Sequence, residues 1–309
     1  MKNKLIMLVG LPSSGKSTYA KEMQDNLGYI VLSSDALRQE MFGDVNCQDK
    51  NNKLFNELHR RIKVHLQQGD NVCYDACNIN YKKRMAFLQQ IKSINCTKSC
   101  IIIARPYELC INFDNIRQKS VGKDVITRMY YNFTIPQYYE GWDNISIVQN
   151  YDITDIETQS MLWERLNAMP QDNPYHTKTI GKHCDSCHEI YTNIVTNGLN
   201  KPLSQKQYHQ CIAAQWHDVG KWRVKTYNEN KGYHTFYNHQ NVGAYDTMIY
   251  LLPKFIIVDY VLYICNLIQW HMQPFFLTTQ KSIDKFINLV GEEFYNDLLL
   301  LHKSDKLAK

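Results

Sequence analysis

One glycine-containing segment constrains this sequence more than any other feature. Residues 10–17 match the pattern G-x-x-x-x-G-K-[ST] at every fixed position. An apolar run at residues 5–9 predicts a buried strand before the segment, and a helix is expected after it over residues 16–27. Such a loop turns its backbone N–H groups toward phosphates, and the helix adds positive potential. The sequence therefore predicts a nucleotide-binding loop formed by Gly10, Ser13, Ser14, Gly15, Lys16, Ser17 and Thr18.

Short apolar runs recur along the first half of the chain. They lie at residues 29–32, 72–74, 99–104 and 145–148. Between them, residues 52–68 carry apolar side chains at helical spacing, and residues 124–133 are also expected to be helical. Strands that alternate with helices indicate a parallel sheet. We therefore expect residues 1–165 to form an α/β domain, a parallel sheet with flanking helices.

The pattern changes near residue 170. Residues 169–173 are polar and turn-rich, and Pro174 follows them. Beyond this point we find long helical patterns and no convincing alternation of strands. The expected helices cover residues 176–196, 204–216, 239–250, 254–270, 282–285 and onward, and 294–306. Residues 170–309 are therefore expected to form an all-α domain.

Composition excludes several classes of protein. Apolar residues make up 44% of the 309 residues, so a core can form without disulfides. The formal net charge of +5 does not indicate nucleic-acid binding by itself, although a local basic groove is compatible with it. No segment is apolar enough to span a membrane, and the N-terminus runs into the glycine motif without a cleavable leader. We expect a cytoplasmic protein with no membrane partner, whose ten scattered cysteines are reduced thiols.

Two residue pairs suggest phosphoryl transfer. In a loop of this kind Lys16 reaches the β- and γ-phosphates of ATP, and Ser17 holds Mg²⁺. Asp35 follows the second expected strand, where a carboxylate can accept a proton from an acceptor hydroxyl. Arg38 lies one helical turn further on and could bind a phosphate on that acceptor. The alternative is that Asp35 only caps a helix and Arg38 is solvated.

Other charged residues extend this candidate site. Asp75 ends the third expected strand, where it could support Mg²⁺ or the acceptor; a strand-end cap is the alternative. Arg117 and Arg128 flank residues 118–123, which contain Lys and Gly. Such a segment suits a lid that carries arginines to the transferring phosphoryl group. Both arginines would otherwise be surface residues of helices.

The first ~150 residues resemble the kinase domain of phage-type polynucleotide 5′-kinases. The motifs that carry the resemblance are GLPSSGKST at 10–18, SSDALRQ at 33–39, YDACNINYKKR at 74–84 and KDVITRMYYNF at 123–133. The resemblance implies that Asp35 is the general base, that Arg38 binds the acceptor phosphate and that Asp75 supports the acceptor site. It also implies a lid arginine on the donor phosphates. This chain has Thr127 where the family has that arginine, and Arg128 is the nearest candidate.

Histidines gather in the second half, where nine of the eleven lie. His217 and Asp218 are adjacent, so they cannot face one way along a regular helix, but they can converge on a metal that other segments also bind. Imidazole and carboxylate donors suit Mn, Fe, Ni or Zn. Any single histidine could instead be a core or surface residue. The candidate partners are His183, His239, His271 and Asp305.

The order His, His-Asp, Asp resembles the HD phosphohydrolase superfamily over residues 175–309, in particular the HD domain attached to bacterial tRNA nucleotidyltransferases. The motifs are AAQWHDVGK at 213–221, NHQNVGAY at 238–245, WHM at 270–272 and LLLLHKSDKLAK at 298–309. The resemblance implies a divalent transition metal such as Mn²⁺, Ni²⁺ or Co²⁺. The implied ligands of the first metal are His183, His217, Asp218 and Asp305.

The same resemblance gives roles to three further residues. His239 and His271 would hold a second metal or the scissile phosphate, and Lys221 would pair with phosphate. Gln240 stands where this subgroup commonly has Glu. The segment Cys184-x-x-Cys187-His188 also fits the pattern of c-type haem attachment, but we expect two thiols on a helix instead.

The sequence leads to one main hypothesis and two alternatives. The main hypothesis is a bifunctional RNA-repair enzyme that phosphorylates a 5′-OH end of RNA or DNA with ATP and hydrolyses a 2′,3′-cyclic or terminal phosphate. One alternative is a nucleoside or small-metabolite kinase fused to a nucleotide phosphohydrolase. The other is an ATP-gated regulatory protein. A basic groove leading to Asp35 would favour a polymer, whereas a closed pocket would favour a metabolite.

Overall fold

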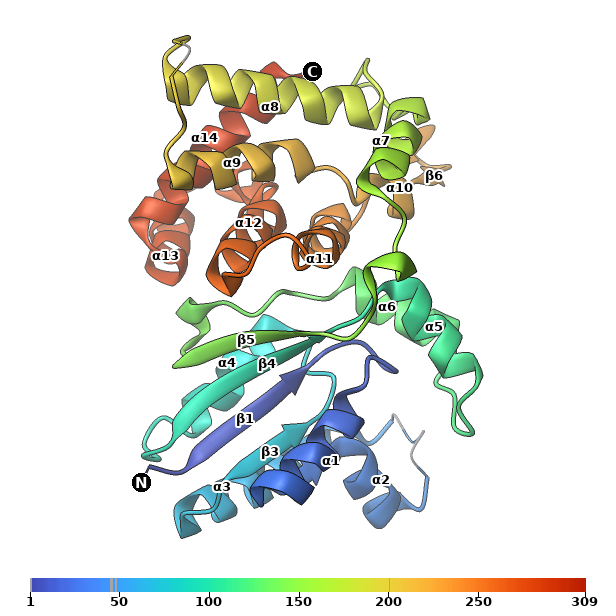
Figure 1. Ribbon diagram of the computed structural model, residues 1–309, viewed down its shortest axis with the longest axis vertical. Coiled ribbons are helices and arrows are strands. Elements are labelled where there is room, and N and C mark those ends of the chain that lie inside the picture. Colours follow the sequence, from blue (N-terminus) through green and yellow to red (C-terminus); the bar gives the residue numbers. More distant parts are fainter. Residues whose placement is uncertain (1, 45–46, 48, 200) are drawn as a thin grey trace. The chain divides into compact units, whose positions relative to one another are not determined.

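Two compact units make up the computed structural model, which describes residues 2–44, 47, 49–199 and 201–309 (Figure 1). The α/β unit comprises Met1–Tyr130 and Pro136–Asp152. The helical unit comprises Tyr131–Ile135 and Ile153–Lys309. The domain limits expected from the sequence, 1–165 and 170–309, stay a prediction. Among the described residues, none of the helices combines the length and the apolar character that a membrane span needs.

A five-stranded parallel sheet forms the centre of the α/β unit, as the sequence predicted. Its order is β2-β3-β1-β4-β5. The central position of β1 explains why its residues are almost all apolar, since both faces of the strand are covered. The strands are β1 (Lys4–Val9), β2 (Ile30–Ser33), β3 (Val72–Asp75), β4 (Thr97–Ala104) and β5 (Asn144–Gln149).

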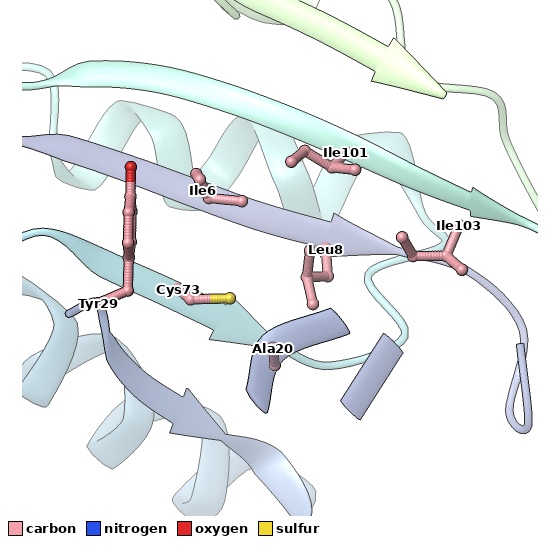
Figure 2. Close-up of a cluster of buried hydrophobic side chains, with 7 residues drawn as sticks. All are labelled: Ile6, Leu8, Ala20, Tyr29, Cys73, Ile101 and Ile103. Carbon is pink, nitrogen blue, oxygen red and sulfur yellow. The ribbon is translucent and has the colours of Figure 1, made fainter. Parts of the chain in front are cut away.

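Helices cover both faces of this sheet. Ile6 and Leu8 of β1 pack toward Ala20 of α1 (Lys16–Leu27) (Figure 2). Because side chains alternate along a strand, Leu5 and Met7, which are also buried, point to the opposite face. The helix α3 buries its leucine and isoleucine stripe at the spacing that the sequence indicated. The helices of this unit are α1 (Lys16–Leu27), α2 (Ser34–Phe42), α3 (Asn51–Gln68), α4 (Tyr81–Gln90), α5 (Tyr107–Asn115) and α6 (Lys123–Tyr131).

A buried ion pair joins α4 to the short 3₁₀ helix Tyr138–Glu140. Arg84 donates from Nε and Nη2 to the two carboxylate oxygens of Glu140 at 2.7 and 2.6 Å, and both side chains are almost fully buried. Trp142 Nε1 donates to the same carboxylate at 3.1 Å. Every oxygen of the carboxylate therefore has a partner, which a buried charge requires.

We expect Glu140→Ala to destabilise the α/β unit by about 3–5 kcal/mol, because the guanidinium of Arg84 would stay buried without its counter-charge. Chemical denaturation would measure the loss. Glu57→Ala is the matched control, since Glu57 pairs with Arg60 and Arg61 at the surface and should contribute far less. Equal effects of the two changes would contradict the prediction.

The second unit is helical, but it is not all-α as the sequence led us to expect. Its helices are α7 (Gln159–Ala168), α8 (Ile180–Thr196), α9 (Gln205–Trp216), α10 (Lys221–Val224), α11 (His239–Leu251), α12 (Val258–Trp270), α13 (Gln280–Val290) and α14 (Glu292–Leu307). An antiparallel hairpin, β6 (Thr226–Asn228) and β7 (Tyr233–Thr235), lies between α10 and α11. Three-residue strands are too short to produce an alternating pattern, which is why the sequence analysis missed them.

A five-residue segment belongs to the helical unit although both of its neighbours in sequence belong to the α/β unit. Within Tyr131–Ile135, Phe133 and Ile135 are fully buried. The Ile135 amide donates to Gln269 Oε1 at 2.7 Å, and the Phe133 ring meets Tyr245 edge-on with centroids 4.8 Å apart. The core of the helical unit is therefore completed by residues from the first half of the chain.

Candidate functional site

The predicted nucleotide-binding loop joins β1 to α1. Gly15 precedes the helix with φ of 99°, and a side chain there would also collide with Asn150 Nδ2. Lys16 is buried, and its ammonium group donates to the Leu11 carbonyl at 2.6 Å. Ser17 and Thr18 are exposed in the first turn of α1. The loop therefore has the backbone and the cation that a phosphate site needs.

Asp75 lies beside this loop at the end of β3. Its Oδ2 accepts a hydrogen bond from Ser17 Oγ at 3.0 Å. Burial raises the pKa of Asp75, while the charge of Lys16 and the hydrogen bond from Ser17 oppose that rise. A hydroxyl and a carboxylate at hydrogen-bond distance are the oxygen donors that could hold Mg²⁺.

Three residues that the sequence analysis missed support the loop. Arg105 donates to the Ser13 carbonyl at 2.7 Å, and Asn150 donates to the Ser14 carbonyl at 2.7 Å. Asp114 accepts from Ser13 Oγ at 3.2 Å. These residues follow β4, follow β5 and lie in α5, so no local motif connects them with the loop. Only the order of strands in the sheet brings them together.

Asp35 and Arg38 meet in the first turns of α2. Ser33, not Asp35, provides the N-terminal cap of this helix, because its Oγ accepts from the Asp35 amide. The Asp35 side chain is 60% exposed, whereas Arg38 is buried and donates to Asp35 Oδ1 at 3.0 Å. Arg38 also donates to Asn51 Oδ1 at 3.0 Å. An exposed carboxylate thus lies against a guanidinium of fixed orientation.

The segment after α5 is anchored to the nucleotide-binding loop. Asp114 accepts from Ser120 Oγ at 2.6 Å and from the Gly122 amide at 3.0 Å. Arg117 Nη1 lies 3.4 Å from Ser13 Oγ, so Arg117 contacts the loop, as Arg105 does. Arg128 lies on the exposed side of α6, and its predicted role stays a prediction. Thr127, where the resemblance leads one to expect arginine, bonds to the Tyr107 hydroxyl at 2.6 Å.

The predicted histidines and aspartates of the second half come together in the helical unit. Nε2 of His183 lies 3.0 Å from Asp305 Oδ1 and 3.3 Å from Asp218 Oδ2. Nε2 of His217 lies 3.4 Å from Asp218 Oδ2 and 3.5 Å from Asp305 Oδ1. These four residues are the first donor group, and they come from α8, the turn after α9, and α14.

A second donor group shares Asp218. Nε2 of His239 lies 3.1 Å from Asp218 Oδ1, and Nε2 of His271 lies 3.6 Å from the same oxygen. The two oxygens of one carboxylate therefore face two different groups. Gly220 allows the close approach, since a side chain there would collide with the His239 carbonyl and with Gly243 of α11. The group comprises Asp218, His239 and His271.

The orientation of these rings favours metal binding. His217, His239 and His271 each direct Nδ1 at a backbone carbonyl, at 2.8, 2.7 and 2.6 Å. A carbonyl can only accept, so Nδ1 carries a proton, and Nε2 is the ring atom left to bind a metal. Nε2 of His239 lies 3.0 Å from Nε2 of His271, so one cation can contact both ring nitrogens. The donors therefore fit a transition-metal ion.

Electrostatics agree with the presence of a cation. Burial disfavours protonation of His217, yet the Asp218 and Asp305 carboxylates raise its pKa well above the usual range. Despite burial, Lys221 and His217 hold the pKa of Asp218 well below its usual range. Lys221 Nζ lies 2.5 Å from Asp218 Oδ2. The two carboxylates of this histidine–aspartate centre, which comprises both donor groups, therefore attract positive charge, and Lys221 and His217 supply it.

Three further residues lie near the centre: His176, which the sequence did not point to, and Cys184 and Cys187, which were expected to be two thiols on a helix. The ring of His176 meets His183 edge-on with centroids 4.8 Å apart, and burial lowers the pKa of His176 to about 3. Cys184 and Cys187 are fully buried on α8, and burial raises the pKa of Cys184 to about 12. Both thiols are therefore inert core residues.

The first half of the chain matches a known family. Residues 5–136 match the model AAA_33, described as an AAA domain. With the sheet and the loop described above, this match shows that the α/β unit is a P-loop domain similar to those of kinases. Such a domain implies ATP and Mg²⁺ as cofactors.

Curated relatives of this half include kinases of several kinds. L-seryl-tRNA(Sec) kinase of Methanococcus maripaludis is 29% identical over 150 residues, 45% of this chain and 56% of the relative. A putative bifunctional polynucleotide phosphatase/kinase of Acanthamoeba polyphaga mimivirus is 29% identical over 158 residues, 48% of this chain and 34% of the relative. The matched part of the chain thus spans about half or less of these relatives.

Solved structures similar to the chain include kinases as well. A putative kinase from Chloroflexus aurantiacus is 16% identical, with a TM-score of 0.41 over 53% of this chain and 98% of that one. A chain of the Pnkp1/Rnl/Hen1 complex is 22% identical, with a TM-score of 0.34 over 40% of this chain and 43% of that one.

Proposed function

We propose that this chain is a bifunctional enzyme that heals broken nucleic-acid ends. Its α/β unit would transfer phosphate from ATP to a 5′-OH end. Its helical unit would be an HD-type phosphohydrolase that acts on a 2′,3′-cyclic or terminal phosphate. The observation that carries the proposal is the pairing of exposed Asp35 with buried Arg38 on the P-loop edge, in the same chain as the two histidine–aspartate donor groups.

The kinase half of the proposal rests on the roles of three side chains. The Asp35 carboxylate would accept the proton of the attacking hydroxyl. Arg38, oriented by Asn51, would bind the phosphate next to that hydroxyl, since a guanidinium matches phosphate in shape and charge. A polynucleotide has such a phosphate and a free nucleoside does not. The mimivirus relative, whose name refers to polynucleotides, supports this choice of acceptor.

The donor phosphates would lie on the loop. Lys16 would turn its ammonium group from the Leu11 carbonyl to the β- and γ-phosphates. Ser17 and Asp75 would hold Mg²⁺, which spreads the charge of the transferring phosphoryl group. Arg117 would face the same phosphates from the segment anchored by Asp114.

The hydrolase half rests on the shared carboxylate of Asp218. The first donor group and the second would each hold a divalent transition metal such as Mn²⁺, Ni²⁺ or Co²⁺. A metal held there would polarise a phosphoryl oxygen. Lys221 would exchange its contact with Asp218 for the substrate phosphate, which brings a competing negative charge. RNA cleavage that leaves a 5′-OH and a 2′,3′-cyclic phosphate needs both activities before the ends can be joined.

We expect Asp35→Asn to keep ATP binding and to lose at least about 10²-fold in phosphoryl transfer, which is the scale of general-base catalysis. Asparagine can still accept the hydrogen bond from Arg38, so the fold of α2 should persist. The assay follows labelled phosphate from ATP to a 5′-OH oligoribonucleotide, with a panel of nucleosides and sugars alongside.

Asp25→Asn is the matched control, because Asp25 is an exposed carboxylate of α1. Near-normal transfer by Asp35→Asn would remove Asp35 from the mechanism. Transfer to nucleosides or sugars in preference to the oligonucleotide would establish the metabolite-kinase alternative. ATP binding with no transfer to any acceptor would favour a regulatory protein.

A further inference from the structure

Three tyrosines cluster beside the hairpin of the helical unit. Tyr175 and Tyr237 are 59% and 63% exposed. The hydroxyls of Tyr175 and Tyr233 are 3.3 Å apart, and their rings meet edge-on with centroids 5.9 Å apart. We call Tyr175, Tyr233, Tyr237 and the lysine among them, Lys231, the tyrosine platform. Large exposed aromatic side chains gathered on one surface indicate a binding site.

A cation lies among these rings. Lys231 Nζ is 5.9 Å from the centroid of the Tyr233 ring and 5.5 Å from that of Tyr237, and it donates to the Tyr237 hydroxyl at 3.1 Å. A site that combines aromatic faces with a positive charge suits a ligand that has both flat rings and phosphates. Single-stranded nucleic acid is a ligand of this kind.

The hairpin gives the platform a defined side. Because Asn228 pairs with Tyr233 and Tyr227 pairs with His234, these two pairs project from opposite faces of the two-stranded sheet. The platform lies on the Tyr233 face. Tyr227, which is 54% exposed, lies on the other face against the ring of His234.

Chain connections join the platform to the histidine–aspartate centre. Tyr175 precedes His176, whose ring packs against His183 of the first donor group. Tyr237 stands two residues before His239 of the second donor group. The His234 amide donates to the Asp172 carbonyl at 3.1 Å, which ties the hairpin to the loop that carries Tyr175. Tyr237 is therefore two residues from a member of the centre, and Tyr175 is next to a residue whose ring contacts another member.

We infer that the tyrosine platform binds the bases at the 3′ end of a single-stranded polynucleotide, while the terminal phosphate lies at the histidine–aspartate centre. This inference rests on the proposed hydrolase function and adds the substrate class to it. Stacking on tyrosine does not depend on the identity of the base, so the platform would accept any terminal sequence. It would also distinguish a polynucleotide end from a small phosphate ester that has no base.

The test measures binding and hydrolysis separately. The probe is an oligoribonucleotide with fluorescein on its 5′ end, which removes the acceptor hydroxyl, and a 2′,3′-cyclic phosphate on its 3′ end. Fluorescence anisotropy with chelator-treated full-length protein gives Kd without turnover. A second probe lacks the two bases nearest the 3′ end. The KM for hydrolysis of the first probe is then measured with metal restored.

The variant Tyr175→Leu/Tyr237→Leu should bind the intact probe at least about 10-fold more weakly, since one base stacked on an aromatic ring contributes about 1–3 kcal/mol. Wild-type protein should bind the abasic probe as weakly as the variant binds the intact one. Tyr175→Phe/Tyr237→Phe should keep wild-type affinity because the rings remain. Tyr227→Leu, on the other face of the hairpin, is the matched control and should change nothing.

The outcomes separate the two proposals. Equal Kd values for wild type and the double Leu variant, or for intact and abasic probes, would overturn the platform, and its tyrosines would then be free to contact a protein. Platform-dependent binding without hydrolysis in any metal would overturn the hydrolase function and leave the platform standing. Hydrolysis with an unchanged KM in the double Leu variant would overturn the platform and leave the hydrolase function standing.

Discussion

Lys16→Ala is expected to reduce phosphoryl transfer by at least about 10³-fold, the scale on which a cation facing the transferring phosphoryl group acts. The ammonium group lies inside the loop on the Leu11 carbonyl, so its loss removes the main positive charge that the donor phosphates would meet. Transfer from labelled ATP to a 5′-OH oligoribonucleotide measures the effect. Hydrolysis of a 2′,3′-cyclic phosphate, measured in the same preparation, should not change.

Lys21→Ala is the matched control for this variant. Lys21 is an exposed lysine of the same helix, α1, so its removal changes the net charge equally without touching the loop. Near-normal transfer by Lys16→Ala would show that the loop does not hold the donor as proposed. Loss of both activities in a folded Lys16→Ala protein would show that the two sites are not independent.

Asp218→Asn is expected to weaken metal binding by at least about 100-fold, because even residues that only hydrogen-bond to metal ligands contribute about 10- to 100-fold. The loss should affect both donor groups, since each contacts a different oxygen of this carboxylate. Elemental analysis after dialysis against Mn²⁺, Ni²⁺ or Co²⁺ gives the occupancy. Hydrolysis should be lost with the metal, and Mg²⁺ alone should support it less well in the wild type.

His188→Gln is the matched control, because His188 lies on α8 like His183 but bonds to the Cys211 carbonyl instead of the centre. Circular dichroism would establish that Asp218→Asn is folded, and phosphoryl transfer should be intact. Equal metal content in wild type and Asp218→Asn would rule out a metal centre at Asp218. Full hydrolysis by metal-stripped protein would rule out the metal-dependent mechanism.

The sheet could be predicted because its signals are local. Each strand is a short apolar run that ends at a turn residue, and such a run can be recognised without knowing which strands lie beside it. The order of the strands and the hairpin could not be predicted this way. Strand order depends on pairing across long separations, and the strands of the hairpin contain only three residues each.

The candidate sites divide along similar lines. Asp35 and the histidines could be predicted as site residues because each lies in a motif whose residue types indicate a particular chemistry. Asp114 and Asn150 had no such motif, yet they hold Ser13 and the Ser14 carbonyl of the nucleotide-binding loop. They reach the loop only because segments that are far apart in the sequence lie close together in the folded protein. The sequence offered both Arg117 and Arg128 as lid arginines; Arg117 Nη1 lies 3.4 Å from Ser13 Oγ, and the role of Arg128 stays a prediction.

The segment Tyr131–Ile135 means that the two units are interleaved along the polypeptide. The chain passes from one unit to the other three times, after residues 130, 135 and 152. Cleavage after residue 152 would therefore leave Phe133 and Ile135 on the N-terminal fragment. The C-terminal helical fragment would then have an empty apolar cavity at the positions of their side chains. A peptide that supplies residues 131–135 in trans would be needed to fill it. Neither unit is encoded by one uninterrupted segment of the coding sequence.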